Sequence, residues 1–169
     1  MSIDQYEFIG IYDKYAPKIF TYCFFRVGSK EDAEDIASKV FLKTWDYLLS
    51  GKDVDNMQAF LYKTAGNLVI DYYRTSKRNK EISIEQFGVT LEIPEEATFV
   101  EAIDKEIALT EVMKHIQCLP DNYREVILLR FMQDMSVPEI AEATGVSENN
   151  VSVRLHRAIE KLKQIATEV

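Results

Sequence analysis

The sequence has few of the residues that mark several classes of protein. Among its 169 residues are two cysteines, Cys23 and Cys118, too few and too far apart for a disulfide framework or a CxxC site. No apolar run approaches the ~20 residues needed to span a bilayer. The acidic and polar start, MSIDQYEFIG, is unlike a signal peptide. We therefore expect a cytoplasmic protein that is not membrane-embedded, with two buried or partly buried thiols.

The motifs of common enzymes are also missing. The sequence contains no glycine-rich phosphate loop, no HExxH and no nucleophile with a nearby base. His115 and His156 fall in different predicted helices. An enzyme is therefore disfavoured, and we expect no catalytic residue, no cofactor and no metal site.

The residues that are abundant indicate a packed, all-α protein. Hydrophobic residues make up 47% of the chain, with only six glycines and four prolines, which is typical of a globular protein. Apolar residues recur mainly at three- and four-residue steps, the spacing of amphipathic helices. Around Tyr12 to Val27 the chain is rich in aromatics, and Pro17 fits there if it opens a helical turn.

Acidic charge is concentrated in the middle of the chain. The net charge is −8, yet residues 1–80 carry 12 lysines and arginines against 11 aspartates and glutamates. Residues 81–120 carry 2 against 9, and residues 121–169 carry 6 against 8. This distribution, with Gly88 and Pro94, predicts an acidic linker between two helical units.

Two helices are predicted in the first unit after the aromatic segment. Ser29 and Asp32 fit the start of the first, and Gly51 fits its end. Its expected apolar stripe consists of Ala33, Ile36, Ala37, Val40, Phe41, Thr44 and Leu48. Asn56 can cap the next helix, whose expected stripe consists of Phe60, Leu61, Thr64, Ala65, Leu68 and Tyr72.

The second unit ends in a predicted helix-turn-helix. One helix is expected before Pro120, and another over DNYREVILLRFMQ with Tyr123, Val126, Ile127 and Phe131 as a core face. Ser136 and Glu139 then form a capping box, Gly145 suits the turn, and Ser147 can cap the last helix. The expected inward residues of this pair are Ile140, Ala141, Val146, Val151, Leu155 and Leu162. A plain helical hairpin has similar spacing, so the motif alone does not establish a DNA-binding role.

The outward face of the last helix favours DNA binding. Asparagine can bond adenine bidentately and arginine can bond guanine. The candidates for this role are Asn149, Asn150, Ser152, Arg154, His156 and Arg157.

Three segments together resemble the extracytoplasmic-function (ECF) sigma factors of bacterial RNA polymerase. The segments are YDKYAPKIFTYCFFRVGSKEDAEDIASKVFLKTW, FLYKTAGNLVIDYYRTSKR and LPDNYREVILLRFMQDMSVPEIAEATGVSENNVSVRLHRAIEKL. The resemblance implies two small helical domains, residues 1–80 and 105–169, joined by a linker over residues 81–104. It also implies binding to core RNA polymerase, promoter-specific initiation and, commonly, restraint by an anti-sigma factor, with no small-molecule substrate.

The same resemblance implies roles for individual residues. The helix after Ser29 would dock on a coiled coil of the largest polymerase subunit through Asp32, Asp35, Lys39, Lys43 and Trp45. The second segment would read and melt the minus-ten element through Asn56, Lys63, Asn67, Asp71, Tyr73, Arg74, Lys77 and Arg78. Cations there suit phosphates, and Tyr62, Tyr72 and Tyr73 offer rings for base stacking. The last helix would read the minus-thirty-five element, and an apolar surface of its unit would hold the polymerase flap.

One departure from the family pattern keeps alternatives open. Many relatives have a cation followed by serine just before the RLHRA run, where this chain has Ser152 and Val153. The loss of a phosphate contact predicts a weaker grip on upstream DNA. A stand-alone helix-turn-helix regulator and a sigma-mimicking interaction protein remain the competing hypotheses. A linker of about 25 residues also predicts that the free protein is more compact than the promoter-bound one.

Overall fold

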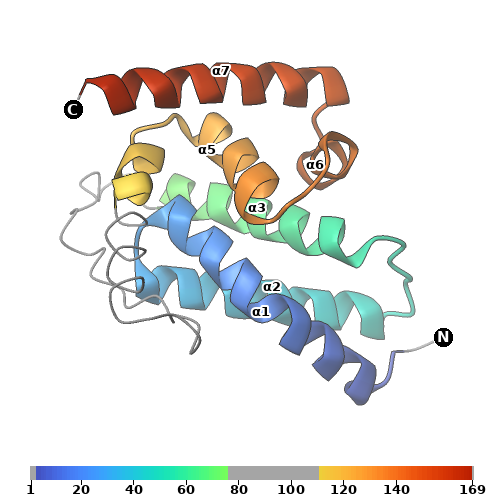
Figure 1. The fold of residues 1–169 in the computed structure, drawn as a ribbon. Helices are drawn as coiled ribbons and strands as arrows, with labels where there is room; N and C mark the ends of the chain where they lie inside the picture. Colours follow the sequence, from blue (N-terminus) through green and yellow to red (C-terminus); the bar gives the residue numbers. More distant parts are fainter. Residues whose placement is uncertain (1–2, 76–110, 169) are drawn as a thin grey trace, which may run out of the picture.

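Two helical units make up the part of the chain that the structure, a computed structural model, describes: residues 3–75 and 111–168 (Figure 1). The N-terminal unit comprises α1 (Gln5–Val27), α2 (Lys30–Leu49) and α3 (Met57–Thr75). The C-terminal unit comprises a helical stretch at residues 111–117, α5 (Asp121–Ile127), the π-helical η2 (Leu128–Met132), α6 (Val137–Thr144) and α7 (Glu148–Thr167). The all-α prediction is confirmed. The predicted linker, residues 81–104, lies outside the described residues.

The first helix begins well before the proline that was expected to open it. Asp4 caps α1, accepting from the Glu7 amide at 2.8 Å, and the helix then runs through Pro17 to Val27. The prediction that Pro17 opens a helical turn is therefore wrong. Pro17 and Asp13 are both exposed, so the Asp13 carbonyl, which the missing Pro17 amide leaves without its helical donor, can bond water instead.

The second helix follows its sequence pattern fully. The Ser29 side chain accepts from the Asp32 amide at 3.3 Å and caps α2. The buried residues of α2 are the seven of the predicted stripe: Ala33, Ile36, Ala37, Val40, Phe41, Thr44 and Leu48. A helix with one buried face and one solvated face gives an unambiguous pattern.

The third helix is buried on a broader surface than its pattern indicated. Asn56 caps α3 as expected, accepting from the Ala59 amide at 3.1 Å. Leu61 and Ala65 are buried as predicted, whereas Phe60, Thr64, Leu68 and Tyr72 are only half-buried. The buried set is Ala59, Leu61, Tyr62, Ala65, Gly66 and Val69, because α3 packs on α1 and α2 on one side and on α6 on the other.

A π-helical turn changes which residues face the core in the next helix. α5 continues into η2, where the wider turn shifts the face that each later residue presents. Leu128 and Leu129 are therefore buried, whereas Phe131 is 63% exposed. The prediction that Phe131 belongs to the core face is wrong.

The helix-turn-helix forms as predicted. Ser136 and Glu139 form a capping box at the start of α6, with Pro138 in the first turn. Gly145 ends α6 in the left-handed conformation (φ 72°), and the Ser147 side chain accepts from the Asn150 amide at 3.2 Å to start α7.

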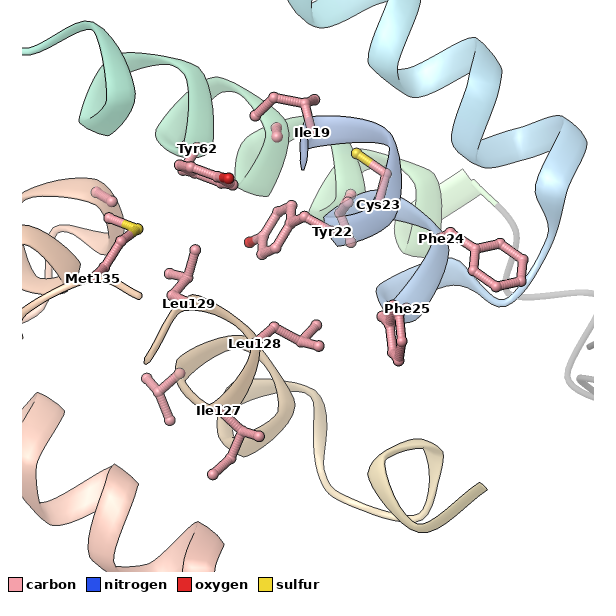
Figure 2. Packing of buried hydrophobic residues seen from close by; sticks show 14 of the residues in the cluster. Ile19, Tyr22, Cys23, Phe24, Phe25, Tyr62, Ile127, Leu128, Leu129 and Met135 are labelled. Atoms are coloured by element: carbon pink, nitrogen blue, oxygen red, sulfur yellow. The ribbon is translucent and has the colours of Figure 1, made fainter. Parts of the chain in front are cut away.

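The two units pack together around one continuous core. α5 and α6 lie between α7 and the layer formed by α1, α2 and α3 (Figure 1). Figure 2 shows Tyr22 of α1 and Tyr62 of α3 close to Leu128 and Leu129 of η2. This packing agrees with the expectation that the free chain is compact.

Three further expectations concern absences and thiols. Within the described residues, no helix is long and apolar enough to cross a membrane. Across residues 3–75 and 111–168, no three His, Cys, Asp or Glu side chains are grouped as metal ligands. Cys23 is buried, but Cys118 is exposed, so the expectation of two buried or partly buried thiols is wrong for Cys118.

Candidate nucleic-acid interface

α3 presents a row of polar side chains on its solvent side. Lys63, Asn67, Asp71 and Arg74 are all exposed, and Arg74 lies 3.8 Å from Asp71 in an ion pair. These four residues and Tyr73 are the minus-ten candidates on α3 that the structure describes. Lys77 and Arg78 lie outside the described residues.

The tyrosines of α3 are less available than the sequence suggested. Tyr62 is only 1% exposed, and its hydroxyl donates to Gln133 of the C-terminal unit over 2.6 Å. Tyr73 is half-buried, and its hydroxyl donates to the backbone carbonyl of Arg26. Tyr72 donates to Asp32 at 2.8 Å. The expectation that Tyr62 offers a free ring for base stacking is wrong while the two units are packed together, because the C-terminal unit covers the ring.

A hollow lies where the loop after α2 meets the start of α3. It has a volume of about 240 Å³ and is lined by Tyr47, Asp53, Val54, Asp55, Asn56, Ala59, Phe60, Lys63 and Glu142. The rings of Tyr47 and Phe60 lie 4.8 Å apart. The Asn56 amide donates to the Glu142 carboxylate of α6 at 3.2 Å. We call this hollow the loop pocket; it joins two aromatic faces with hydrogen-bonding groups, a combination that suits a nucleobase.

α7 presents its candidate residues to solvent. Val151, Leu155 and Ala158 are buried, which fixes the rotation of the helix about its axis. The opposite side holds the minus-thirty-five candidates: Asn149, Asn150, Ser152, His156 and Arg157 are exposed and Arg154 is half-exposed. All six therefore lie on one accessible surface, near the N-terminal half of α7.

The candidate polymerase-binding face of α2 is mixed. Lys43 is exposed, and Lys39 pairs with Asp35 over 2.9 Å, both exposed. Asp32 is half-buried. Trp45 is also half-buried and packs on the Phe8 ring of α1 with centroids 4.8 Å apart. The structure thus brings Asp35, Lys39 and Lys43 to one solvated face, with Asp32 and Trp45 at its border.

An apolar hollow opens on the C-terminal unit. It has a volume of about 320 Å³ and is lined by Phe25, Val112, Ile116, Ile127, Phe131, Met132, Ile159 and Leu162. Phe131 is 63% and Val112 49% exposed at this site. We call it the apolar groove; a surface of this kind suits the apolar face of a helix.

A buried charge cluster joins the two units. The Arg26 side chain of α1 is 1% exposed and lies 2.7 Å from the Asp121 carboxylate and 3.4 Å from that of Glu125, both on α5. It also donates to the Tyr22 hydroxyl at 2.7 Å. Arg124 of α5 donates to the backbone carbonyl of Arg26 over 3.1 Å. A buried arginine requires such partners, because an unpaired buried charge is strongly unfavourable.

Burial raises the pKa values of the tyrosines and the thiol around this cluster. Desolvation raises the pKa of Tyr22 well above its ordinary value and raises that of the Cys23 thiol to about 12. Burial also raises the pKa of Tyr62 and of Tyr73. For Arg26, burial lowers the pKa, but the neighbouring Tyr22, Glu125 and Asp121 more than offset it, so the guanidinium stays charged.

Sequence reasoning missed this contact between the units. The signal was a lone arginine in an aromatic run, TYCFFRV, and the acidic residues Asp121 and Glu125 spaced one turn apart. The spacing shows that the carboxylates share a helix face. Nothing in it shows that this face meets Arg26, which lies about a hundred positions away in the sequence.

Comparison with known proteins gives matches over both units. Residues 11–79 match the family model "Sigma-70 region 2", and residues 109–162 match "Sigma-70, region 4". The chain is 31% identical to the ECF RNA polymerase sigma factor SigW of Bacillus subtilis, over 95% of this chain and 89% of the relative. It is 28% identical to the ECF RNA polymerase sigma factor SigM of the same species, over 98% and 95%.

Two solved structures share the fold. The sigma factor RpoE in complex with the anti-sigma factor NepR from Bartonella quintana has a TM-score of 0.73 at 18% identity, covering 95% of this chain and 97% of that one. CnrH in complex with the cytosolic domain of CnrY has a TM-score of 0.73 at 22% identity, covering 98% and 90%. At such identities the likeness concerns the fold alone.

Proposed function

Since the chain belongs to the ECF group of the sigma-70 family and is a factor for promoter-specific transcription initiation, we propose that its two units read separate promoter elements. The N-terminal unit (residues 1–80) would read and melt the minus-ten element. The C-terminal unit (residues 105–169) would read the minus-thirty-five element, with residues 81–104 as the linker between them.

The observation that carries the proposal is the helix-turn-helix and the polar face of its second helix. α6 and α7 are held at a fixed angle by the Gly145 turn and by a shared core of Ile140 and Val151. This arrangement leaves the N-terminal half of α7 free to enter a major groove. Asn150 and Arg157 on that face can make base contacts, each worth about 1–3 kcal/mol of discrimination.

For the minus-ten element, the support comes from the loop pocket and the exposed row of α3. Lys63 is exposed and lines the pocket together with Asn56 and Phe60, and Asn67 is exposed one turn further along α3. A flipped base would occupy the pocket, while Lys63 and Arg74 would contact phosphates. Tyr73 would join this surface only after its hydroxyl leaves Arg26.

Core RNA polymerase would bind two further surfaces. The solvated face of α2, with Asp35, Lys39 and Lys43, would meet the coiled coil of the largest subunit. The apolar groove around Phe131 would hold the flap. We also propose an anti-sigma factor as a partner, since the structural relative RpoE was co-crystallised with the anti-sigma factor NepR.

The proposed role is non-enzymatic and cytoplasmic, as the family's work on RNA polymerase requires, with no cofactor and no small-molecule substrate. The change to Ser152 and Val153 would weaken the hold on upstream phosphates. A stand-alone regulator would not explain the match of residues 11–79. A sigma mimic would bind polymerase without directing transcription.

Run-off transcription tests the proposal. Genomic fragments would be transcribed by core RNA polymerase from the same bacterium, with and without this protein. We expect discrete new transcripts whose upstream sequences share two elements. Asn67→Ala and Arg157→Ala should abolish them, whereas Lys163→Ala, an exposed change near the end of α7, should not. Binding to core enzyme without transcripts would instead indicate a mimic.

A further inference from the structure

We propose that Val153 reads a thymine of the minus-thirty-five element through the C5 methyl group of that base. This inference rests on the proposed function of α7 and makes that function more specific. It gives a role in sequence discrimination to a side chain that has neither a hydrogen-bond donor nor a hydrogen-bond acceptor.

Val153 is an apolar side chain on a polar surface. Within α7 as the structure describes it, Val153 is the most exposed large hydrophobic residue, at 37%. The helix buries Val151, Leu155 and Ala158 instead. Valine is also a weaker helix former than alanine or leucine, so an exposed valine in mid-helix does little to stabilise the free protein. Burial of this side chain in a complex with DNA gives it a use that the free protein does not.

Helix geometry places Val153 at the centre of the candidate DNA-reading face. Each residue turns an α-helix by about 100°, so Val153, two residues from both Val151 and Leu155, points about 160° away from each of them. Asn149 lies four residues before Val153 and Arg157 four residues after it, and both are exposed. Residues four apart share a helix face. Val153 therefore lies between an asparagine and an arginine that face the same groove.

The chemistry of the major groove makes thymine the base that suits Val153. Adenine, guanine and cytosine present hydrogen-bonding groups there, whereas thymine presents a C5 methyl group beside its O4 acceptor. A valine that covers a donor or an acceptor removes water without offering a partner, which is unfavourable. Against a thymine methyl, the same side chain buries apolar surface on both molecules. Val153 therefore favours thymine over the other three bases.

The spacing along α7 indicates where this thymine lies in the element. An α-helix rises about 1.5 Å per residue, so Asn149, Val153 and Arg157 follow one another at steps of about 6 Å. Base pairs are stacked about 3.4 Å apart. For a helix that lies along the groove, neighbouring members of this row thus meet bases about two positions apart. We expect the thymine between the base that Asn149 contacts and the base that Arg157 contacts, on either strand.

The same contact accounts for the departure from the family pattern. Ser152 and Val153 stand where many relatives have a cation followed by serine. A cation binds phosphate whatever the sequence, so its loss lowers the affinity for all DNA. A contact between valine and thymine adds affinity at one base pair alone. The pair Ser152 and Val153 therefore lowers general DNA affinity and raises the ratio of specific to non-specific binding.

Removing one methyl group from the DNA tests the contact directly. In a promoter found by run-off transcription, each thymine of the minus-thirty-five element, on both strands, is replaced singly by deoxyuridine, which lacks the C5 methyl group. Labelled templates are titrated with holoenzyme formed from core RNA polymerase and the full chain. We expect one position at which deoxyuridine raises the Kd roughly fourfold, the change for losing the burial of one methyl-sized group. Deoxyuridine between the two promoter elements should leave the Kd unchanged.

Variants of Val153 assign the effect to this side chain. Val153→Ala should make the Kd values for thymine and deoxyuridine nearly equal at that position, whereas Val153→Ile should keep the difference. Ile9→Ala, which truncates an aliphatic side chain that is 52% exposed on α1, is the matched control and should also keep it. The ratio of two Kd values for one protein cancels any change in the amount of folded protein. Alanine is also the better helix former, so Val153→Ala should preserve α7.

Two results would overturn this inference alone. One is an element with no thymine whose replacement raises the Kd, and the other is a methyl preference that persists in Val153→Ala. With either result, loss of transcripts in Arg157→Ala would show that α7 still reads the element without Val153. If the unmodified chain gives no discrete transcripts, the proposed function is wrong and this inference is wrong with it.

Discussion

Arg26 and Arg124 are linked across the boundary between the two units, since the Arg124 guanidinium donates to the Arg26 backbone carbonyl over 3.1 Å. The Arg26 side chain in turn meets Asp121, three residues before Arg124, at 2.7 Å. Each arginine thus has a bonding partner on the helix that carries the other arginine. The N-terminal and C-terminal units are consequently coupled in stability as well as in position.

Arg124→Ala should destabilise the protein by about 2–4 kcal/mol, because buried carbonyls lose their donors. Arg124 is 7% exposed and also donates to the carbonyls of Ile116, Gln117 and Leu119 at 3.2, 2.9 and 2.9 Å. Arg124→Lys should not restore stability, since an ammonium lacks the planar fork. Urea unfolding measures the change. The control Arg74→Ala, which removes an exposed ion pair, should change the free energy of unfolding by less than about 0.5 kcal/mol. A similar loss of unfolding free energy in both variants would contradict this role for Arg124.

Alkaline pH should destabilise the folded protein. Burial raises the pKa of Cys23 from 9.0 to about 12 and raises those of Tyr22, Tyr62 and Tyr73 above 10.0. The folded protein therefore keeps protons that the unfolded chain releases. Stability is present below pH 9 and declines from pH 9 toward pH 12, by up to about 1.4 kcal/mol per pH unit for each proton.

Urea unfolding at pH 8, 9.5 and 10.5 measures this decline. Tyr62→Phe/Tyr73→Phe removes two of the four groups and should show a shallower decline from pH 9.5 to 10.5. An unfolding free energy that is constant or rises over this range would show that these groups titrate as freely in the folded protein as in the unfolded chain.

Adding a Cβ at Gly145, in the turn of the helix-turn-helix, should lower the stability of the protein. Gly145 has φ 72°, and a Cβ built there would meet nothing within 4 Å. Gly145→Ala should therefore destabilise the protein through backbone strain alone, by about 1–2 kcal/mol. Gly10→Ala is the matched control: it lies inside α1, also in open space, and should stabilise the protein by about 0.5–1 kcal/mol. Equal effects of the two changes, measured by urea unfolding, would contradict this explanation.

The sequence predicted best those helices that bury a single face. The stripe of α2 and the caps at Ser29, Ser136 and Ser147 follow from local chemistry, and all are confirmed. The same reasoning was wrong for part of α3 because this helix packs on two sides, so Tyr62 was predicted to face outward although it is buried. A periodic pattern describes one face and cannot show that a distant unit covers a second.

Two other differences have physical causes that the sequence does not display. The π-turn at Leu128–Met132 shifts the face presented by Phe131, and no composition rule reveals it. The Arg26 cluster depends on contacts between residues about a hundred positions apart. The candidate DNA residues of α7 were placed correctly on its exposed face, because their positions follow from the core residues Val151 and Leu155 alone.

Phe131→Ser should weaken binding to core RNA polymerase without weakening the fold. Phe131 is 63% exposed at the apolar groove, so its replacement should change the unfolding free energy by less than about 0.5 kcal/mol. If the groove holds the flap, however, the ring becomes buried in the complex. Truncating a buried aromatic anchor at an interface costs about 2 kcal/mol or more, so the Kd should rise about thirtyfold. Tyr6→Ser, which removes an aromatic that is 75% exposed on α1, serves as the control and should leave the Kd unchanged. Titration of fluorescently labelled protein with core enzyme measures both variants, and an unchanged Kd for Phe131→Ser would show that the flap binds elsewhere.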